Sequence, residues 1–232
     1  MVEIKGLEKF APKDFPGFIA STVFLGGCPF RCPFCHNSDL VLRPDNLTTI
    51  PMDFFLGFID SREGWLEGVC VSGGEPLIHE DLDIFLSVLK QRNLRVKIDT
   101  NGSNPRHLKA LIEKGLVDTV AMDVKAPLDK YSEAAGVDVE TRAIQETIRL
   151  LKEAGVDYFF RTTVVPGLVE KKDIAQIGKM LQGSPSYQIQ QFSPDNTLVP
   201  EYRTRIPYTV EQLKAMKEIA EPYFREVRIE GV

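Results

Sequence analysis

The chain has 232 residues, of which 43% are hydrophobic and 26% are charged, and its formal net charge is −5 at pH 7. This acidic balance argues against a nucleic-acid-binding surface, which is usually basic, and the lack of any run of 18 apolar residues argues against a membrane-spanning helix. Because Met1 to Lys5 include no apolar segment of the kind found in secretory signals, we expect a cytoplasmic protein.

Strand-like and helix-like patterns alternate along the chain from residue 18 onward. In chain order they predict a strand at 18–25, a helix at 54–59, a strand at 69–71, a helix at 81–92, a strand at 95–99, a helix around 108–112, a strand at 117–122, a helix around 144–151, a strand at 156–165, a helix around 174–181, a strand at 187–192, a helix around 213–219 and a strand at 226–229. Thr209 and Gln212 have the spacing of a capping box before the last helix. Strands that alternate with helices usually pair in parallel through crossovers, so we expect an α/β fold. Six such units are too few to close an eightfold barrel, and the pattern alone also allows a doubly wound open sheet.

Nothing in the sequence divides the chain into separate parts. It contains no internal repeat, low-complexity tract or long linker, and 232 residues are enough for one sizeable core. We therefore expect residues 1–232 to form a single domain, with a core at about 16–192 and a C-terminal helix–strand extension at about 207–230.

Three of the four cysteines lie within eight residues. Cys28, Cys32 and Cys35 have the spacing C-x3-C-x2-C, and no further cysteine lies nearby. Thiolates are soft ligands that suit iron–sulfur clusters, and three of them can hold three corners of a [4Fe–4S] cube while the fourth iron stays open. The fourth cysteine, Cys70, lies in an apolar run and is interpreted as a small buried hydrophobic residue.

Three other interpretations of the cysteine loop are open, and each explains less. A disulfide suits secreted chains better and is unfavourable between neighbours on one tight loop. A structural zinc site with His36 as the fourth ligand would crowd all its ligands into nine residues. Covalent haem, which Cys32-Pro33-Phe34-Cys35-His36 would allow, requires export and leaves Cys28 unexplained. The position of Cys28 therefore favours the cluster.

Polar and glycine residues follow the predicted strands at the ends where α/β enzymes bind their ligands. These positions are Cys28 to Cys35, Ser72-Gly73-Gly74-Glu75-Pro76, Asp99-Thr100-Asn101-Gly102, Asp123 with Lys125, Arg161 with Val165, and Gln190-Gln191. Each one alone is weak evidence, since Gly-Gly after a strand is often only a turn. Arg161 is the least ordinary, because a guanidinium within an apolar strand needs a partner. His79 and His107 are interpreted as surface or capping residues.

The cysteine loop, with Phe34 directly before the third cysteine, resembles the signature of the radical S-adenosylmethionine (SAM) superfamily. Cys35-His36-Asn37-x-Asp39 and Asp14-x-Pro16-Gly17 resemble the activating enzymes of glycyl radical enzymes. The greatest similarity is to activators of anaerobic ribonucleoside-triphosphate reductase, in the form that is similar to the pyruvate formate-lyase activator. This resemblance spans about residues 10–192 and implies a partial (β/α)6 barrel that is open on one side.

The resemblance also implies the cofactors and the residues that hold them. One [4Fe–4S] cluster would be bound by Cys28, Cys32 and Cys35, and its open iron would bind SAM. The SAM-binding residues would be Phe34, Gly73, Gly74, Glu75, Asp99, Asn101, Lys125 and Arg161. The glycines would allow close approach of the backbone, Glu75 would accept from the SAM ammonium, and Lys125 and Arg161 would meet its carboxylate or ribose. No catalytic side chain is implied beyond the cluster and the cofactor.

A monovalent cation is a further implication of the resemblance. In the pyruvate formate-lyase activator, an Asp-Thr pair and the aspartate of an Asp-x-Lys motif bind one. The matching residues here are Asp99, Thr100 and Asp123. The chain departs from that relative after its sixth strand, where Ser193 stands near the position of a histidine, so the adenosyl contact there is not carried over.

By the same resemblance, we expect an anaerobic oxidoreductase that cleaves SAM reductively to a 5′-deoxyadenosyl radical, which takes hydrogen from a partner's glycine. The first-choice partner is anaerobic ribonucleotide reductase, with pyruvate formate-lyase second, and the reductant would be of the flavodoxin or ferredoxin type. A radical enzyme acting on a small molecule, such as 7-carboxy-7-deazaguanine synthase, is the alternative among enzymes. A zinc-stabilised binding module is the alternative outside them.

Overall fold

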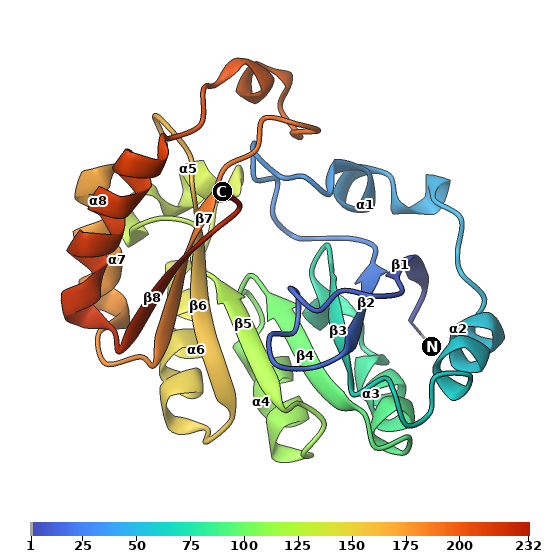
Figure 1. Ribbon diagram of the computed structural model, residues 1–232. Coiled ribbons are helices and arrows are strands. Elements are labelled where there is room, and N and C mark those ends of the chain that lie inside the picture. The colour runs from blue at the N-terminus through green and yellow to red at the C-terminus, as the bar shows by residue number, and fades with distance from the viewer. Residues whose placement is uncertain (1) are drawn as a thin grey trace. The chain divides into compact units, whose positions relative to one another are not determined.

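The computed structural model describes residues 2–232, in which the strands follow one another in chain order (Figure 1). These residues form two units, the first made of 2–29, 39–100 and 104–120, the second of 30–38, 101–103 and 121–232. In the first unit, β1 (Ile4–Glu8) pairs antiparallel with β2 (Ala20–Leu25), and β2, β3 (Gly68–Gly73) and β4 (Arg95–Thr100) pair in parallel. In the second unit, β6 (Asp157–Val164), β7 (Ser186–Gln191) and β8 (Glu226–Glu230) pair in parallel. The strand β5 (Thr119–Asp123) has residues in both units.

Helices alternate with the parallel strands as the sequence pattern predicts. They are α1 (Ser38–Leu42), α2 (Met52–Asp60), α3 (Leu82–Lys90), α4 (Pro105–Glu113), α5 (Tyr131–Ala135), α6 (Thr141–Glu153), α7 (Lys171–Leu181) and α8 (Val210–Ala220), with short 3-10 turns at Pro44–Asn46, Pro76–Ile78, Leu128–Lys130, Pro200–Thr204 and Glu221–Tyr223. Every predicted helix and strand is present. The predicted capping box is confirmed, since Thr209 and Gln212 each bond the other's backbone N–H at the start of α8. The strand β1 and the helices α1 and α5 are present in addition to the predicted elements.

The core of each unit lies between its strands and the helices that pack on them. In the first unit, Val69 and Val71 of β3 and Val96 and Ile98 of β4 are fully buried, and α3 packs on β4. In the second unit, α8 packs on β7 and β8 and also against α7 (Figure 1). Their apolar residues recur with the helical period that the sequence shows.

The α/β class and the open sheet are confirmed by the strand order, which begins with β1 and ends with β8. In residues 2–232 no helix is long and apolar enough to cross a lipid bilayer, which takes about 20 residues.

The helix α3 allows a direct test of this packing. Phe85 is fully buried, with its ring 5.7 Å from that of Phe55, whereas its neighbour Ile84 is 53% exposed. We expect Phe85→Ala to lower the free energy of unfolding by about 3–5 kcal/mol, and Ile84→Ala to change it by less than about 0.5 kcal/mol. Urea unfolding of the two variants measures the difference, and equal losses would contradict the assigned face.

Candidate functional site

The candidate residues fall into two groups, one in each unit. The first unit holds Cys28, Gly73, Gly74, Glu75, Asp99 and Thr100, and the second holds Cys32, Phe34, Cys35, Asn101, Asp123, Lys125 and Arg161. Most of these residues lie at or just after the carboxyl ends of β2 to β5, as the sequence pattern predicts, whereas Arg161 lies inside β6.

In the first unit, the backbone that leaves β3 lies directly against the backbone that leaves β2. The N–H of Gly74 donates to the Leu25 carbonyl at 2.9 Å, and that of Glu75 donates to the Gly27 carbonyl at 2.8 Å. A Cβ on Gly74 would stand 1.9 Å from the Gly27 oxygen, and one on Gly73, whose φ is +118°, would stand 2.3 Å from the Leu25 oxygen. Both glycines are therefore required by contact between backbones.

Glu75 is buried and fixed by two donors. Its Oε1 accepts from the N–H of Leu77 at 3.1 Å and from the hydroxyl of Thr100 at 2.8 Å. A buried carboxylate needs such partners, so Thr100 sets the orientation of Glu75.

Asp99 lies among polar groups of β3 and β4. The buried ammonium of Lys97 contacts its Oδ1, and the hydroxyl of Ser72 donates to its Oδ2 at 3.2 Å. The Cys70 thiol donates to Asp99 at 3.6 Å and also contacts Lys97 Nζ at 3.5 Å. Burial raises the pKa of Cys70, and the Asp99 carboxylate raises it further, so this thiol is protonated. Cys70 is buried as predicted, but it also takes part in a polar cluster.

Two histidines bind backbone carbonyls in this unit. His79 Nε2 donates to Gly26 at 2.9 Å, directly before the glycine that precedes Cys28. His107 Nδ1 donates to Leu77 at 2.9 Å. Each thus fastens a segment next to a candidate residue, Cys28 in one case and Glu75 in the other.

In the second unit, the start of the cysteine loop packs on α5. The Arg31 N–H donates to the Ala135 carbonyl at 2.7 Å, and the Phe30 ring lies edge-on to that of Tyr131. Gly136, with φ +67°, leaves no space here, because a Cβ would stand 2.1 Å from the Arg31 oxygen. The helix end therefore fixes the backbone just before Cys32.

The end of the loop is held by the segment that follows β7. His36 Nε2 donates to the Ser193 carbonyl at 2.9 Å, and the Asn196 amide donates to the His36 carbonyl at 2.8 Å. The N–H of Val199 donates to Pro33 at 2.9 Å. Both sides of Cys35 are therefore tied to residues 193–199, and the exposed His36 is part of this attachment.

Asp123, Lys125 and Arg161 form a half-buried charged group. Asp123 accepts from Arg161 Nε at 2.6 Å and from Lys125 Nζ at 2.9 Å. Burial alone would raise the pKa of Asp123, but the two cations hold it well below its usual range. Burial opposes the charge of Lys125, whereas Asp123, and after it Cys32, raise the pKa of this lysine. The group has two positive side chains against one carboxylate.

The donor set of the cysteine loop fits an iron–sulfur cluster. No cysteine in residues 2–232 is in a disulfide. Burial raises the pKa of the Cys35 thiol, but the nearby Lys125 ammonium opposes that effect, and a positive charge favours the thiolate that iron binds. Among the described residues, no three His, Cys, Asp or Glu side chains lie close enough together to hold a single metal ion. A [4Fe–4S] cube does not require such a group, since each thiolate binds a different iron.

Two further predicted residues are buried. Phe34 is 5% exposed, and so is Asn101, whose Oδ1 accepts from the Ser103 N–H at 2.9 Å in a local turn. The neighbouring Gly102 carbonyl accepts from the Thr147 hydroxyl at 2.7 Å. Through Thr147, helix α6 therefore holds the segment that follows β4 in place.

Sequence reasoning overlooked Lys97 and did not predict the backbone contacts of His36 and His79. For Lys97 a signal was present, because residues 95, 97 and 99 are polar at alternate positions of a strand whose other residues are apolar. The two histidine contacts join segments far apart in the sequence, and no local pattern reveals them.

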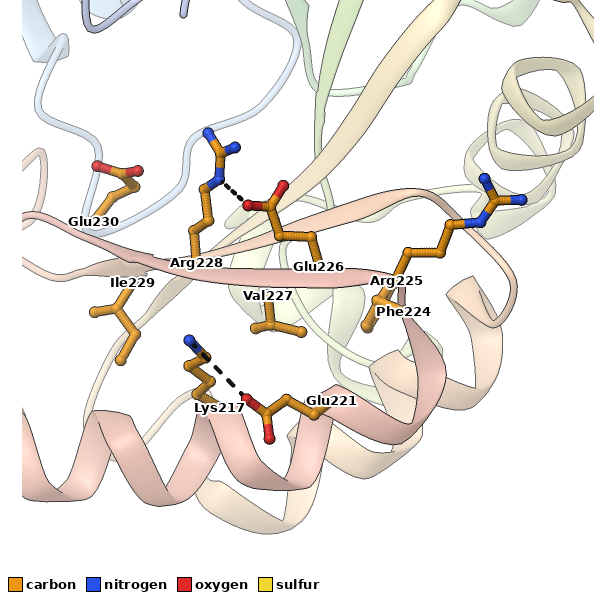
Figure 2. Close-up of a pocket in the computed structure, with 9 residues that line it drawn as sticks. All are labelled: Lys217, Glu221, Phe224, Arg225, Glu226, Val227, Arg228, Ile229 and Glu230. Atoms are coloured by element: carbon orange, nitrogen blue, oxygen red, sulfur yellow. Dashed lines mark hydrogen bonds and ion pairs between the residues drawn. The ribbon is translucent and has the colours of Figure 1, made fainter.

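One cavity of about 700 Å3 lies elsewhere in the second unit, between α8 and β8 (Figure 2). It is lined by Lys217, Glu221, Phe224, Arg225, Glu226, Val227, Arg228, Ile229 and Glu230. In Figure 2, Arg228 and Glu226 form an ion pair of 2.7 Å, and Lys217 lies toward Glu221. None of the predicted site residues lines this cavity, so we do not assign the cofactor to it.

Comparison with known sequences identifies relatives over nearly the whole chain. The sequence model of the radical SAM superfamily matches residues 22–181. A protein of Methanocaldococcus jannaschii, provisionally named a glycyl-radical enzyme activating enzyme, is 32% identical over 99% of this chain and 96% of its own length. The pyruvate formate-lyase-activating enzyme of Streptococcus mutans is 29% identical over 91% of this chain and 84% of its own length.

Solved structures show the same fold. SuiB of Streptococcus suis, bound to the precursor peptide SuiA, matches 88% of this chain with a TM-score of 0.69 and 15% identity, although the chain spans only 47% of SuiB. A domain of the pyruvate-formate lyase-activating enzyme from Bacteroides vulgatus matches 71% of this chain and 99% of that domain, with a TM-score of 0.58 and 19% identity. These likenesses confirm the predicted class, the partial (β/α)6 barrel.

The contact of Gly136 with the cysteine loop yields a prediction with a matched control. Gly155 has the same φ of +67°, but nothing lies within 4 Å of where its Cβ would stand. We expect Gly155→Ala to cost about 1 kcal/mol of folding free energy through backbone strain alone and to leave the bound iron unchanged. Gly136→Ala should cost more and should also lower the iron content, since it displaces the backbone before Cys32. Equal iron content in the two purified variants would contradict this role.

Proposed function

The chain belongs to the radical SAM superfamily and, within it, to the glycyl-radical enzyme activating enzymes, and from this premise we propose that it activates anaerobic ribonucleoside-triphosphate reductase. In this proposal a hydrogen atom is taken from a backbone glycine of that partner. The C-x3-C-x2-C loop is the observation that supports the radical chemistry most, and the overall resemblance of the chain supports the choice of partner.

We assign the [4Fe–4S] cluster of the superfamily to Cys28, Cys32 and Cys35. When bound, the cluster and SAM supply the reductive cleavage of a carbon–sulfur bond that yields the 5′-deoxyadenosyl radical. The protein's contribution is to hold the loop in one conformation. Arg31 is bonded to α5, and Pro33 and His36 are bonded to residues 193–199.

We assign SAM to the strand ends named in the sequence analysis. Glu75, oriented by Thr100, would accept hydrogen bonds from the SAM ammonium. Lys125 and Arg161 are both held by Asp123 and would bind the SAM carboxylate or ribose hydroxyls. Gly73, Gly74, Phe34, Asn101 and Asp99 would shape the walls around the cofactor.

We also propose that residues 1–232 act together as one radical SAM domain, with the core and the C-terminal extension given above. Two observations support this: the superfamily match includes residues of both units, and the M. jannaschii relative aligns over nearly the full chain. An electron donor of the flavodoxin or ferredoxin type would complete the reaction.

Pyruvate formate-lyase is the second candidate partner. The curated S. mutans relative, at 29% identity, is named for that partner. Ser193, near the position where the pyruvate formate-lyase activator has a histidine, is a reason to place this candidate second.

Anaerobic reconstitution of the cluster, followed by reduction with SAM, tests the proposal. We expect 5′-deoxyadenosine, and with the correct partner a glycyl radical signal in electron paramagnetic resonance. A partner in which the target glycine is replaced by alanine is the control and should give no signal. Deoxyadenosine formation with no glycyl radical on either partner would refute both candidate partners and favour another substrate.

Single cysteine variants separate the cluster from a zinc site. We expect Cys28→Ala, Cys32→Ala and Cys35→Ala each to lose most of the bound iron and sulfide, because a cube held at two corners is labile. His36→Ala should keep both, because its imidazole binds Ser193 rather than iron. Zinc without sulfide in the wild-type protein, released by His36→Ala, would instead support a structural metal site.

A further inference from the structure

Both carboxylates that the resemblance assigns to a monovalent cation already face cations of the chain itself. Asp99 contacts the Lys97 ammonium, and Asp123 is bonded to Arg161 and Lys125. The residues therefore do not fit the implied ion, and the physical reason differs between the two aspartates.

At Asp123 a further cation would be repelled. Arg161 donates to one oxygen of this carboxylate and Lys125 donates to the other, both within 3 Å, so both oxygens already have a cationic partner. A further cation there would repel these two side chains strongly, because water is partly excluded.

At Asp99 the ammonium of Lys97 contacts Oδ1 and the hydroxyl of Ser72 donates to Oδ2, so both carboxylate oxygens already have partners from the chain. Lys97 pairs in register with Cys70 of β3, which in turn pairs with Thr22 of β2, so the three form one row across the strands. Asp99 lies two residues beyond Lys97 on the same face of β4. Only 1% of Lys97 is exposed, and a buried ammonium of this kind requires a charged partner.

We propose that the Lys97 ammonium supplies the positive charge that the resemblance assigns to a bound monovalent cation, and that SAM binding is therefore independent of Na+ and K+. An ammonium has the same single charge as K+ and donates up to three hydrogen bonds. Because it is covalently attached, it cannot be washed out or exchanged. Lys97 is thus a positioning residue that acts through Asp99.

The route from Lys97 to the cofactor follows the end of β4. Asp99 is followed directly by Thr100, whose hydroxyl holds Glu75. Without Lys97 the Asp99 carboxylate would lose its ammonium partner in a largely buried place, and the end of β4 would shift or take up an ion. Either change alters the position of Glu75, which the proposed function assigns to the SAM ammonium.

The test measures SAM affinity of the anaerobic holoenzyme in potassium chloride and in choline chloride at equal ionic strength. For the wild-type protein we expect the two dissociation constants to agree within about twofold. For Lys97→Met we expect SAM binding in choline to weaken by about tenfold, within the usual range for coupled ligands, and to recover as K+ or ammonium is added. Recovery should be saturable, as binding at a single site requires.

Lys90→Met is the matched control. Lys90 also forms an ion pair in the first unit, with Asp118 at 2.7 Å, but it is 29% exposed and lies on α3. Its loss should create no cation dependence. The double variant Lys97→Met, Asp99→Asn removes both charges and should show no recovery with K+, because the ligand for the ion is gone.

Wild-type SAM binding that requires K+ or Na+ would overturn the proposal, and so would a Lys97→Met variant that binds SAM normally in choline. If Lys97→Met fails to fold, the wild-type comparison decides the question alone. The inference rests on SAM binding from the proposed function and not on the partner. A protein that binds no SAM even in K+ would refute the proposed function, whereas K+-dependent binding would refute only the role of Lys97.

Discussion

The contact between the backbones that leave β2 and β3 is the constraint on which the first half of the site depends. Because Gly73 and Gly74 have no side chains, the two backbones can approach closely. The N–H groups of Gly74 and Glu75 then donate hydrogen bonds to the carbonyls of Leu25 and Gly27. One bond joins Glu75 to Gly27, the residue directly before Cys28. The position of a predicted cofactor ligand and the start of the cysteine loop are therefore set by the same hydrogen bond.

The second constraint is the pairing of buried charge. Each of the two aspartates at strand ends is matched by cations from the same unit, but the balance differs between them. Asp99 contacts one ammonium, that of Lys97, whereas Asp123 contacts two cations, Lys125 and Arg161. Lys125 lies near Cys32 and Cys35, where its positive charge stabilises thiolates and the anionic cluster that they would hold.

Periodicity predicted the elements because most of them are long enough to show it. The helix α6 places Ile144, Ile148 and Leu151 on one buried face, and this repeat is visible in the sequence. The short helices α1 and α5, of five residues each, contain too few apolar positions to show a repeat. The cysteine spacing and the residues at strand ends could also be predicted, because they depend on local order. The partners of those residues could not, since the contact of Lys97 with Cys70 spans 27 residues and depends on strand register.

The segment after β7 holds the cysteine loop although it lacks the histidine of the pyruvate formate-lyase activator. The resemblance to the pyruvate formate-lyase activator leads one to expect a histidine near residue 193, and the chain has serine there. In the structure an imidazole nevertheless reaches this segment, because His36 donates to the Ser193 carbonyl and Asn196 bonds back to His36. Asn196 adopts φ +52°, a left-handed conformation that asparagine tolerates better than most residues. Ser193 therefore takes part in the attachment of the cysteine loop through its backbone carbonyl. The missing histidine therefore bears on which partner the chain activates. It is no evidence against membership in the family.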